Sequence, residues 1–124
     1  MESLRRRQAR FSHMLGLLLT KATVFQTPVV ILEMYRSVEQ QRINVARGVS
    51  KTMNSKHLDG LAVDLAFLSD LEDDGKINYS PEKYKDLGVF WESIGGRWGG
   101  RFGDDPKTEK IEGWDAGHFE LPSQ

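Results

Sequence analysis

Two short segments, one near the middle of the chain and one near its end, constrain the fold most. The first, SKHLDGLAVD, contains His57 and ends in Asp64, and the second, WDAGHFEL, contains Asp115 and His118. Two imidazoles and one carboxylate give a zinc ion three protein ligands and leave its fourth position open for water. Asp115, three residues before His118, is placed to accept a proton from that water. The chain has only three histidines, so we expect a fold that brings these two segments together.

Spacing alone leaves alternatives for these residues. A single histidine or aspartate is more often a hydrogen-bonded structural residue than a ligand, and only the set as a whole favours a metal site. A carboxylate beside a ligand also commonly orients that histidine instead of reacting, so Asp115 has two candidate roles. Glu112 and Glu120 are the nearest other carboxylates and remain its rivals as the general base.

The sequence around these residues resembles a known family. The pattern S-x-H-x-x-G-x-A-x-D, followed much later by D-x-x-H-F-E, is similar to that of the zinc peptidases of bacterial cell walls. These are the D-alanyl-D-alanine carboxypeptidases and the phage L-alanyl-D-glutamate endopeptidases, which share a fold with the Hedgehog signalling domain. The resemblance covers residues 5–121 and includes EMYRSVEQQ around Arg36 and WESIGGRWGG around Trp98. One departure is Gly117, which stands where many relatives have proline.

The resemblance implies roles for individual residues. It implies a zinc ion held by His57, Asp64 and His118. It also implies that Asp115 is the general base and that Arg36 binds the substrate and steadies the developing oxyanion. Ser55 and Trp98 are the further substrate contacts that we expect. A surface salt bridge remains the alternative for Arg36, and a place in the hydrophobic core remains the alternative for Trp98.

The activity implied by the resemblance is zinc-dependent hydrolysis of the peptide stem of peptidoglycan. We expect an endolysin that cleaves between L-Ala and D-Glu and acts as a monomer. Such an enzyme stays in the host cytoplasm until lysis and then reaches the periplasm and cell wall. A D-alanyl-D-alanine carboxypeptidase is the first alternative. A non-catalytic, zinc-stabilised binding domain, as in Hedgehog-type relatives, is the second.

Composition agrees with one small globular domain spanning residues 1–124. No stretch approaches the ~20 apolar residues that cross a bilayer, so we expect no stable membrane association. Cysteine is absent, so a bound metal takes the place of disulfides as a source of added stability. Residues 1–50 hold eight Lys/Arg and three Asp/Glu, yet the whole chain has a net charge of −1. Nucleic-acid binding is therefore not expected.

The N-terminal segment predicts an amphipathic helix. Its apolar residues recur along one helical face, at Leu4, Phe11, Leu15, Leu18, Ala22 and Phe25. His13 falls opposite this face, so we expect it to be exposed and not a ligand. The arginines before MLGLLL resemble a signal peptide only superficially, because Lys21 interrupts the apolar stretch and no small-x-small cleavage site follows. We therefore expect no export signal.

The strands expected to carry the site show strict alternation. After Gly60, one face of a strand carries Val63, Leu65 and Phe67 toward the core. The other face carries Asp64 between Ala62 and Ala66, which leaves room for a metal and a bound peptide. In the last motif, Phe119 and Leu121 are expected to face the core, and His118 and Glu120 to face the site.

The remaining elements follow from turn and cap signals. The β-formers at 29–32 predict a buried strand, and Ser37 opens a helix that ends near Gly48. The acidic segment 70–75 resembles a calcium loop, but Pro81 occupies the position of its closing glutamate. We favour a surface hairpin there. A helix with Ser80 as its cap follows, and its buried face is formed by Tyr84, Leu87, Trp91 and Ile94.

These elements predict an α+β fold. We expect a small, mainly antiparallel sheet with flanking helices and the zinc site on its open face, as in the Hedgehog and D,D-peptidase fold.

Overall fold

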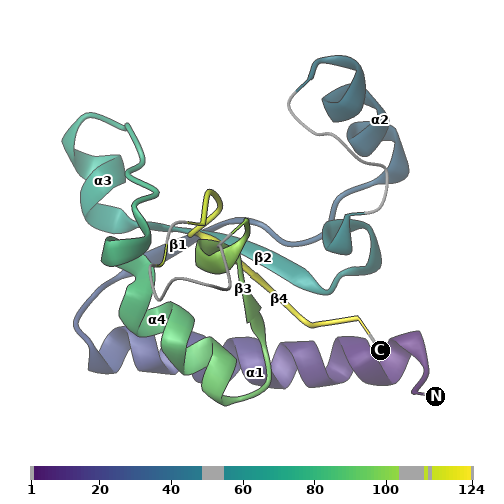
Figure 1. Cartoon of the computed structure of the whole chain (residues 1–124), viewed down its shortest axis with the longest axis horizontal. Coiled ribbons are helices and arrows are strands. Elements are labelled where there is room, and N and C mark those ends of the chain that lie inside the picture. Colours follow the sequence, from purple (N-terminus) through teal and green to yellow (C-terminus); the bar gives the residue numbers. More distant parts are fainter. Residues whose placement is uncertain (1, 49–54, 104–110, 112, 124) are drawn as a thin grey trace.

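The protein is an α+β fold built on one antiparallel sheet (Figure 1). A computed structural model describes residues 2–48, 55–103, 111 and 113–123. Within these residues the sheet has four strands in the order β1-β2-β4-β3, with bounds Val29–Glu33 (β1), Ala62–Phe67 (β2), Arg97–Trp98 (β3) and His118–Glu120 (β4). The helices are α1 (Leu4–Val24), α2 (Val38–Ala46), α3 (Leu68–Asp73) and α4 (Pro81–Ser93), with short 3-10 helices η1 (Lys56–Asp59) and η2 (Gly99–Arg101). The predicted fold class is confirmed.

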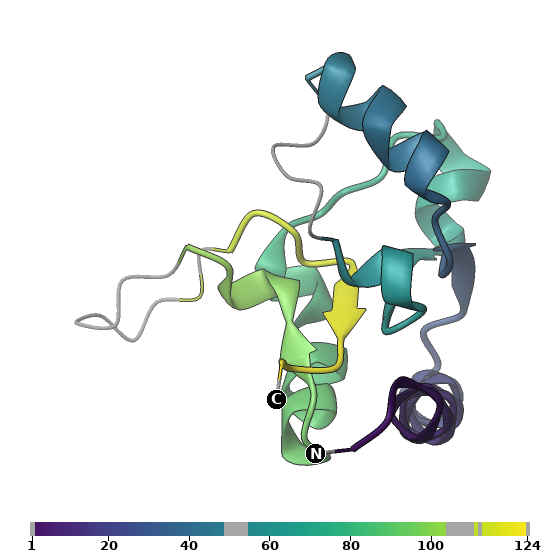
Figure 2. The same ribbon diagram turned by 90° about the vertical axis from the view of Figure 1, so that its right-hand side faces the viewer.

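Helix α1 lies along one face of the sheet, and Figure 2 shows it nearly end-on. Ser3 caps it by accepting a hydrogen bond from the backbone N–H of Arg6. The predicted apolar face packs into the core through Phe11, Leu15, Leu18 and Ala22, and Met14, which was not predicted, joins them. Leu4 and Phe25, at the ends of the helix, stay 45% and 37% exposed. His13 is exposed, as expected.

The core lies between the sheet and the helices α1 and α4. From β2 it takes Val63, Leu65 and Phe67, which are at most 4% exposed, as the alternation predicted. Helix α4 contributes Tyr84, Leu87 and Trp91, with Ile94 packed at the edge of the cluster. Strand β4 adds Phe119, which is fully buried. Because alternate residues of β2 and β4 face this core, the residues between them are available to the other face of the sheet.

Strand β1 forms where it was predicted, but the prediction that it is buried was wrong. It lies at the edge of the sheet and pairs only with β2 in the described part of the chain. Ile31 and Leu32 are 43% and 44% exposed. The register shifts between Ile31 and Glu33, and a bulge of this kind disturbs the inward and outward alternation of a strand. A run of β-formers therefore predicted the strand but not its position in the sheet.

The hairpin predicted at 70–75 was also wrong. Strand β2 leads directly into α3, which begins at Leu68. The helix ends in a turn at Gly75, which has φ +74° and donates its N–H to the carbonyl of Asp70. The Asp70 carboxylate forms an ion pair with Lys83 and accepts a hydrogen bond from the N–H of Asn78. The Asp70 side chain thus fastens α3 to the start of α4.

Helices α2 and α4 begin at the residues predicted to cap them. Ser37 accepts a hydrogen bond from the N–H of Gln40, and α2 ends at Ala46. Ser80 precedes α4 with Pro81 in the first turn, although its side chain makes no capping hydrogen bond. Helix α2 stands apart from the sheet in Figure 1 and buries only Gln41. Among the described helices, none has the combined length and apolar character that a membrane span requires.

Candidate metal centre

Three side chains converge on the face of the sheet opposite α1 and α4. His57, Asp64 and His118 each offer a ligand atom, and these atoms lie within 4.8 Å of one another. The Asp64 carboxylate lies between the two rings, with Oδ2 3.2 Å from His57 Nε2 and Oδ1 3.0 Å from His118 Nδ1. Ligand atoms around a tetrahedral zinc ion are ~3.3 Å apart, given bonds of 2.0–2.1 Å. In the described residues this is the one group of at least three such side chains close enough to hold a metal.

Pairing of β2 with β4 accounts for two of the three positions. Asp64 and His118 are direct partners across the antiparallel register, so their side chains project from the same face. Val63 and Phe119, the next pair along, project into the core instead. The ligands are thus held by the same backbone ladder that builds the core.

His57 is held by the short helix η1. Ser55 precedes this helix, and its hydroxyl accepts a hydrogen bond from the backbone N–H of His57. The Nδ1 of His57 lies 2.9 Å from the carbonyl oxygen of Met34. A carbonyl accepts only, so Nδ1 carries the proton and Nε2 is free to bind a metal. His57 is only 3% exposed, so the residues packed around its ring fix the orientation of the ring.

His118 has a carboxylate partner that the sequence did not assign. Its Nε2 lies 2.8 Å from Glu120 Oε1, and Glu120 is 5% exposed. A proton on Nε2 satisfies this hydrogen bond and leaves Nδ1 as the ligand atom facing Asp64. Glu120 was considered as a general base, but this position instead makes it the partner that orients His118.

Asp115 lies beside the three ligand residues. Its Oδ2 is 3.7 Å from His118 Nδ1, and its side chain is 35% exposed. Its backbone carbonyl accepts the N–H of His118, and its N–H donates to the carbonyl of Gly99. A Cβ at Gly99 would lie 1.9 Å from the Asp115 carbonyl oxygen, so only glycine permits this approach. The rival Glu112 lies outside the described residues.

The pKa shifts within the cluster are those of a site that favours a cation. Burial acts to raise the pKa of Asp64, but hydrogen bonds from His118 and His57 outweigh it and hold that pKa far below its usual range. Burial acts to lower the pKa of His118, but hydrogen bonds to Asp64 and Glu120 raise it to about 9. Burial also raises the pKa of Asp115. His118 thus tends to carry a second proton beside the ionised Asp64, and a bound metal ion would supply this positive charge in its place.

Comparison with known proteins agrees with this geometry. A family model described as phage L-alanyl-D-glutamate peptidase matches residues 8–122. The chain belongs to this family. The family suggested by the sequence motifs is therefore confirmed. A search of curated protein sequences finds no match.

Solved structures similar to this peptidase show its fold. One is the L-Ala D-Glu endopeptidase ChiX of Serratia marcescens, at 24% identity and a TM-score of 0.64, covering 92% of this chain and 79% of that one. Another is a mutant of the vancomycin resistance D,D-pentapeptidase VanY from the VanB-type cassette, solved with Zn(II). It is 22% identical with a TM-score of 0.56, and covers 90% of this chain and 70% of that one.

The Arg36 side chain of this peptidase is mostly buried, and it binds Glu33 and Gln41 instead of the ligand residues. The side chain is 14% exposed. Its Nε donates to Glu33 Oε1 at 2.8 Å, and Nη1 donates to Gln41 Oε1 at 2.6 Å. The backbone N–H of Arg36 donates to the carbonyl of His57. Glu33 Oε1 lies 3.8 Å from His57 Nδ1, so Arg36 adjoins the metal centre through Glu33.

Trp98 occupies the core. It is 1% exposed, and its Nε1–H donates to the carbonyl of Ala116. Its indole is packed so closely that a Cβ at Gly88 or Gly100 would lie about 2.1–2.2 Å from it. The expectation that Trp98 forms a wall of the substrate cleft does not fit this burial. The side chain instead supports the turn that carries Asp115.

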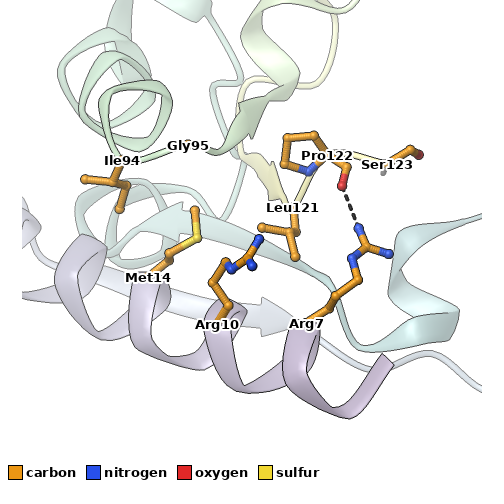
Figure 3. Close-up of a pocket in the computed structure, with 8 residues that line it drawn as sticks. All are labelled: Arg7, Arg10, Met14, Ile94, Gly95, Leu121, Pro122 and Ser123. Atoms are coloured by element: carbon orange, nitrogen blue, oxygen red, sulfur yellow. Dashed lines mark hydrogen bonds between the residues drawn. The ribbon is translucent and has the colours of Figure 1, made fainter. Parts of the chain in front are cut away.

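The cavity in Figure 3 lies away from the metal centre. It has a volume of about 260 Å³ and is lined by Arg7, Arg10, Met14, Ile94, Gly95, Leu121, Pro122 and Ser123. The Arg7 guanidinium donates to the carbonyl of Pro122 at 2.5 Å. Arg10 forms an ion pair with Glu2. The Arg7 hydrogen bond fastens the segment after β4 to α1, whereas the Arg10 ion pair lies within the N-terminal segment.

Proposed function

We propose that this peptidase is a zinc-dependent endolysin that cleaves the L-Ala–D-Glu bond in the peptide stem of peptidoglycan. The observation that carries the proposal is the convergence of His57, Asp64 and His118 with Asp115 beside them, in a chain of this family. A D-alanyl-D-alanine carboxypeptidase is the alternative that the test below separates.

The donor set fits zinc. Two imidazole nitrogens and one carboxylate oxygen match the ligands of hydrolytic zinc sites, which keep a fourth position open. Both histidines have their second nitrogen hydrogen-bonded, to Met34 O and to Glu120, as ligating histidines usually do. When bound, zinc would polarise the scissile carbonyl and lower the pKa of the attacking water toward ~7.

Asp115 is the proposed general base. It accepts a proton from water as the water oxygen bonds to the carbonyl carbon, and it returns that proton to the amine nitrogen as the C–N bond breaks. Burial raises its pKa, which strengthens the carboxylate as a base and makes its acid form a better donor in the second step.

Arg36 and Ser55 are the proposed substrate contacts. A guanidinium presents a planar fork of donors that suits a carbonyl oxygen or carboxylate of the stem peptide. Because Glu33 and Gln41 already hold the Arg36 side chain, a small movement of this group would be needed for direct contact. We further propose that the enzyme acts as a monomer, without nucleic acid or membrane partners, and that it remains in the host cytoplasm until lysis gives it access to the wall.

Digestion of purified peptidoglycan with the zinc-loaded protein, followed by mass spectrometry, tests the proposal. We expect fragments that begin at D-Glu. Loss of only the terminal D-Ala would identify a carboxypeptidase, and intact stems would contradict a peptidase acting on this polymer.

Asp115→Asn is the matched control for that digestion. It keeps the shape of the side chain but accepts no proton, so we expect full zinc content with kcat lower by ~10²-fold or more. Near-normal turnover in this variant would assign the base elsewhere.

A further inference from the structure

Tyr79 lies beside the metal centre, although neither the motifs nor the proposed mechanism uses it. It follows α3 and precedes α4, and its side chain is 41% exposed. Its ring stacks on that of Tyr84, with centroids 6.3 Å apart and planes 21° from parallel. Tyr84 is fully buried, so the exposed ring rests on a fixed one.

The ring of Tyr79 also lies against the turn that carries the last ligand. A Cβ at Gly117, the residue before His118, would lie 3.0 Å from Tyr79 Cε1 and 2.6 Å from the carbonyl oxygen of Leu65. A side chain at position 117 would therefore displace the ring or the strand. Glycine at this position lets the tyrosine lie directly against the backbone between Asp115 and His118.

The hydroxyl of Tyr79 is placed to act as a hydrogen-bond donor. Burial and then the negative charges of Asp64 and Asp115 raise its pKa, so the group keeps its proton at neutral pH. Two carboxylates of the centre thus lie within electrostatic reach of the phenolic oxygen. No hydrogen bond of this hydroxyl is found to any residue in the described part of the chain. Because the ring lies against Gly117, between Asp115 and His118, this partly exposed donor is available to a substrate bound there.

We propose that the Tyr79 hydroxyl donates a hydrogen bond to the scissile carbonyl oxygen as that oxygen becomes negatively charged. The role rests on the proposed function. Water adds to the carbonyl carbon, its proton passes to Asp115, and the π electrons of the C=O bond move onto the oxygen that Tyr79 stabilises. When the C–N bond breaks, the electrons return and the amine takes the proton from Asp115. Tyr79 keeps its own proton throughout.

Tyr84 provides a matched control in the same stack. Its hydroxyl donates to the carbonyl of Leu65 at 3.4 Å and is fully buried, so it has no access to substrate. Tyr79→Phe and Tyr84→Phe each remove one hydroxyl and keep the two stacked rings. Only the first removes a donor from the reaction site, so a purely structural role for both tyrosines predicts equal, small effects.

The test compares both variants with the wild type, each loaded with zinc. For Tyr79→Phe we expect kcat on the L-Ala–D-Glu bond to fall ~10- to 100-fold, KM to stay within about twofold, and zinc content and Tm to be unchanged. A phosphinate that mimics the tetrahedral carbon should bind more weakly by the same factor, because it carries the same charged oxygen. For Tyr84→Phe we expect wild-type kcat and phosphinate affinity, measured below its Tm.

The outcomes separate the two proposals. If the wild type cleaves and Tyr79→Phe matches it in kcat and phosphinate affinity, the role of Tyr79 is overturned and the proposed function stands. A loss of zinc or a lower Tm in Tyr79→Phe, in proportion to the lost activity, would also overturn it in favour of a structural role. If the wild type cleaves no stem peptide, the proposed function fails, and the role of Tyr79 fails with it.

Discussion

The two faces of the β2–β4 pair share one backbone but carry side chains of different chemistry. One face carries Val63, Leu65 and Phe119 into a core closed by α1 and α4, and all three are fully buried. The other carries Asp64 and His118 at the metal centre. Stability and chemistry thus occupy alternate residues of the same two strands. Substitutions one residue apart should therefore affect either metal binding and activity or the free energy of unfolding, because each residue faces only one of the two environments.

The largest effect is expected on the metal face. His118→Ala removes one of three ligands, so we expect it to lose most of its zinc and at least ~10³-fold of its activity. The apolar face is untouched, and the variant should remain folded by circular dichroism. Metal analysis and the peptidoglycan digestion measure both quantities. A variant that kept stoichiometric zinc would show that His118 is not a ligand.

A smaller effect, of a different kind, is expected one strand position away from Asp64. Leu65→Ala leaves a cavity in the core, and we expect the free energy of unfolding to fall by about 3–5 kcal/mol. Because the ligands stay in place, the folded fraction should bind zinc and retain its kcat. Denaturant unfolding and kinetics below the transition test this. A loss of kcat in the folded variant would mean that the two faces are coupled.

The smallest effect concerns the residue that orients a ligand. Glu120→Gln keeps an acceptor for His118 Nε2 but removes its charge, so we expect zinc affinity to fall ~10-fold with little change in Tm. Competition with a chelator of known affinity measures the change. Arg97→Gln is a useful control, because its guanidinium lies 3.5 Å from Glu120 without touching a ligand. Equal zinc affinity in the wild type and Glu120→Gln would show that the charge of Glu120 does not contribute to metal binding.

The sequence predicted the parts of this arrangement that depend on local periodicity. Alternation placed Asp64 and Val63 on opposite faces of β2, and helical spacing placed Phe11 and Leu18 in the core. The motifs then indicated which polar residues belong together. The cluster of His57, Asp64 and His118 is as expected, whereas the roles assigned to Ser55, Arg36 and Asp115 stay predictions.

Other features depend on contacts between distant segments, which local patterns do not contain. Nothing in the run of β-formers reveals that β1 is an edge strand, because edge position is a property of the whole sheet. The burial of Trp98 depends on Gly88 from α4 and Gly100 from η2. Glu120 is an exception, because alternation along the strand already placed it on the same face as His118, and the structure adds the hydrogen bond between them. Tyr79 had no signal in the sequence, because it reaches the centre only through the packing of Tyr84 and Gly117.

The position of β4 has a consequence for how the protein is made. This strand comes after β1, β2 and β3 in the sequence, yet it lies between β2 and β3 and pairs with both. Until β4 has been synthesised, β3 has no strand that joins it to β2. The last ligand, His118, is also still missing. Folding must therefore wait for long-range pairing, which is slow compared with local helix formation. A growing chain holds α1 and β2 but no complete hydrolytic centre until β4 has inserted between β2 and β3.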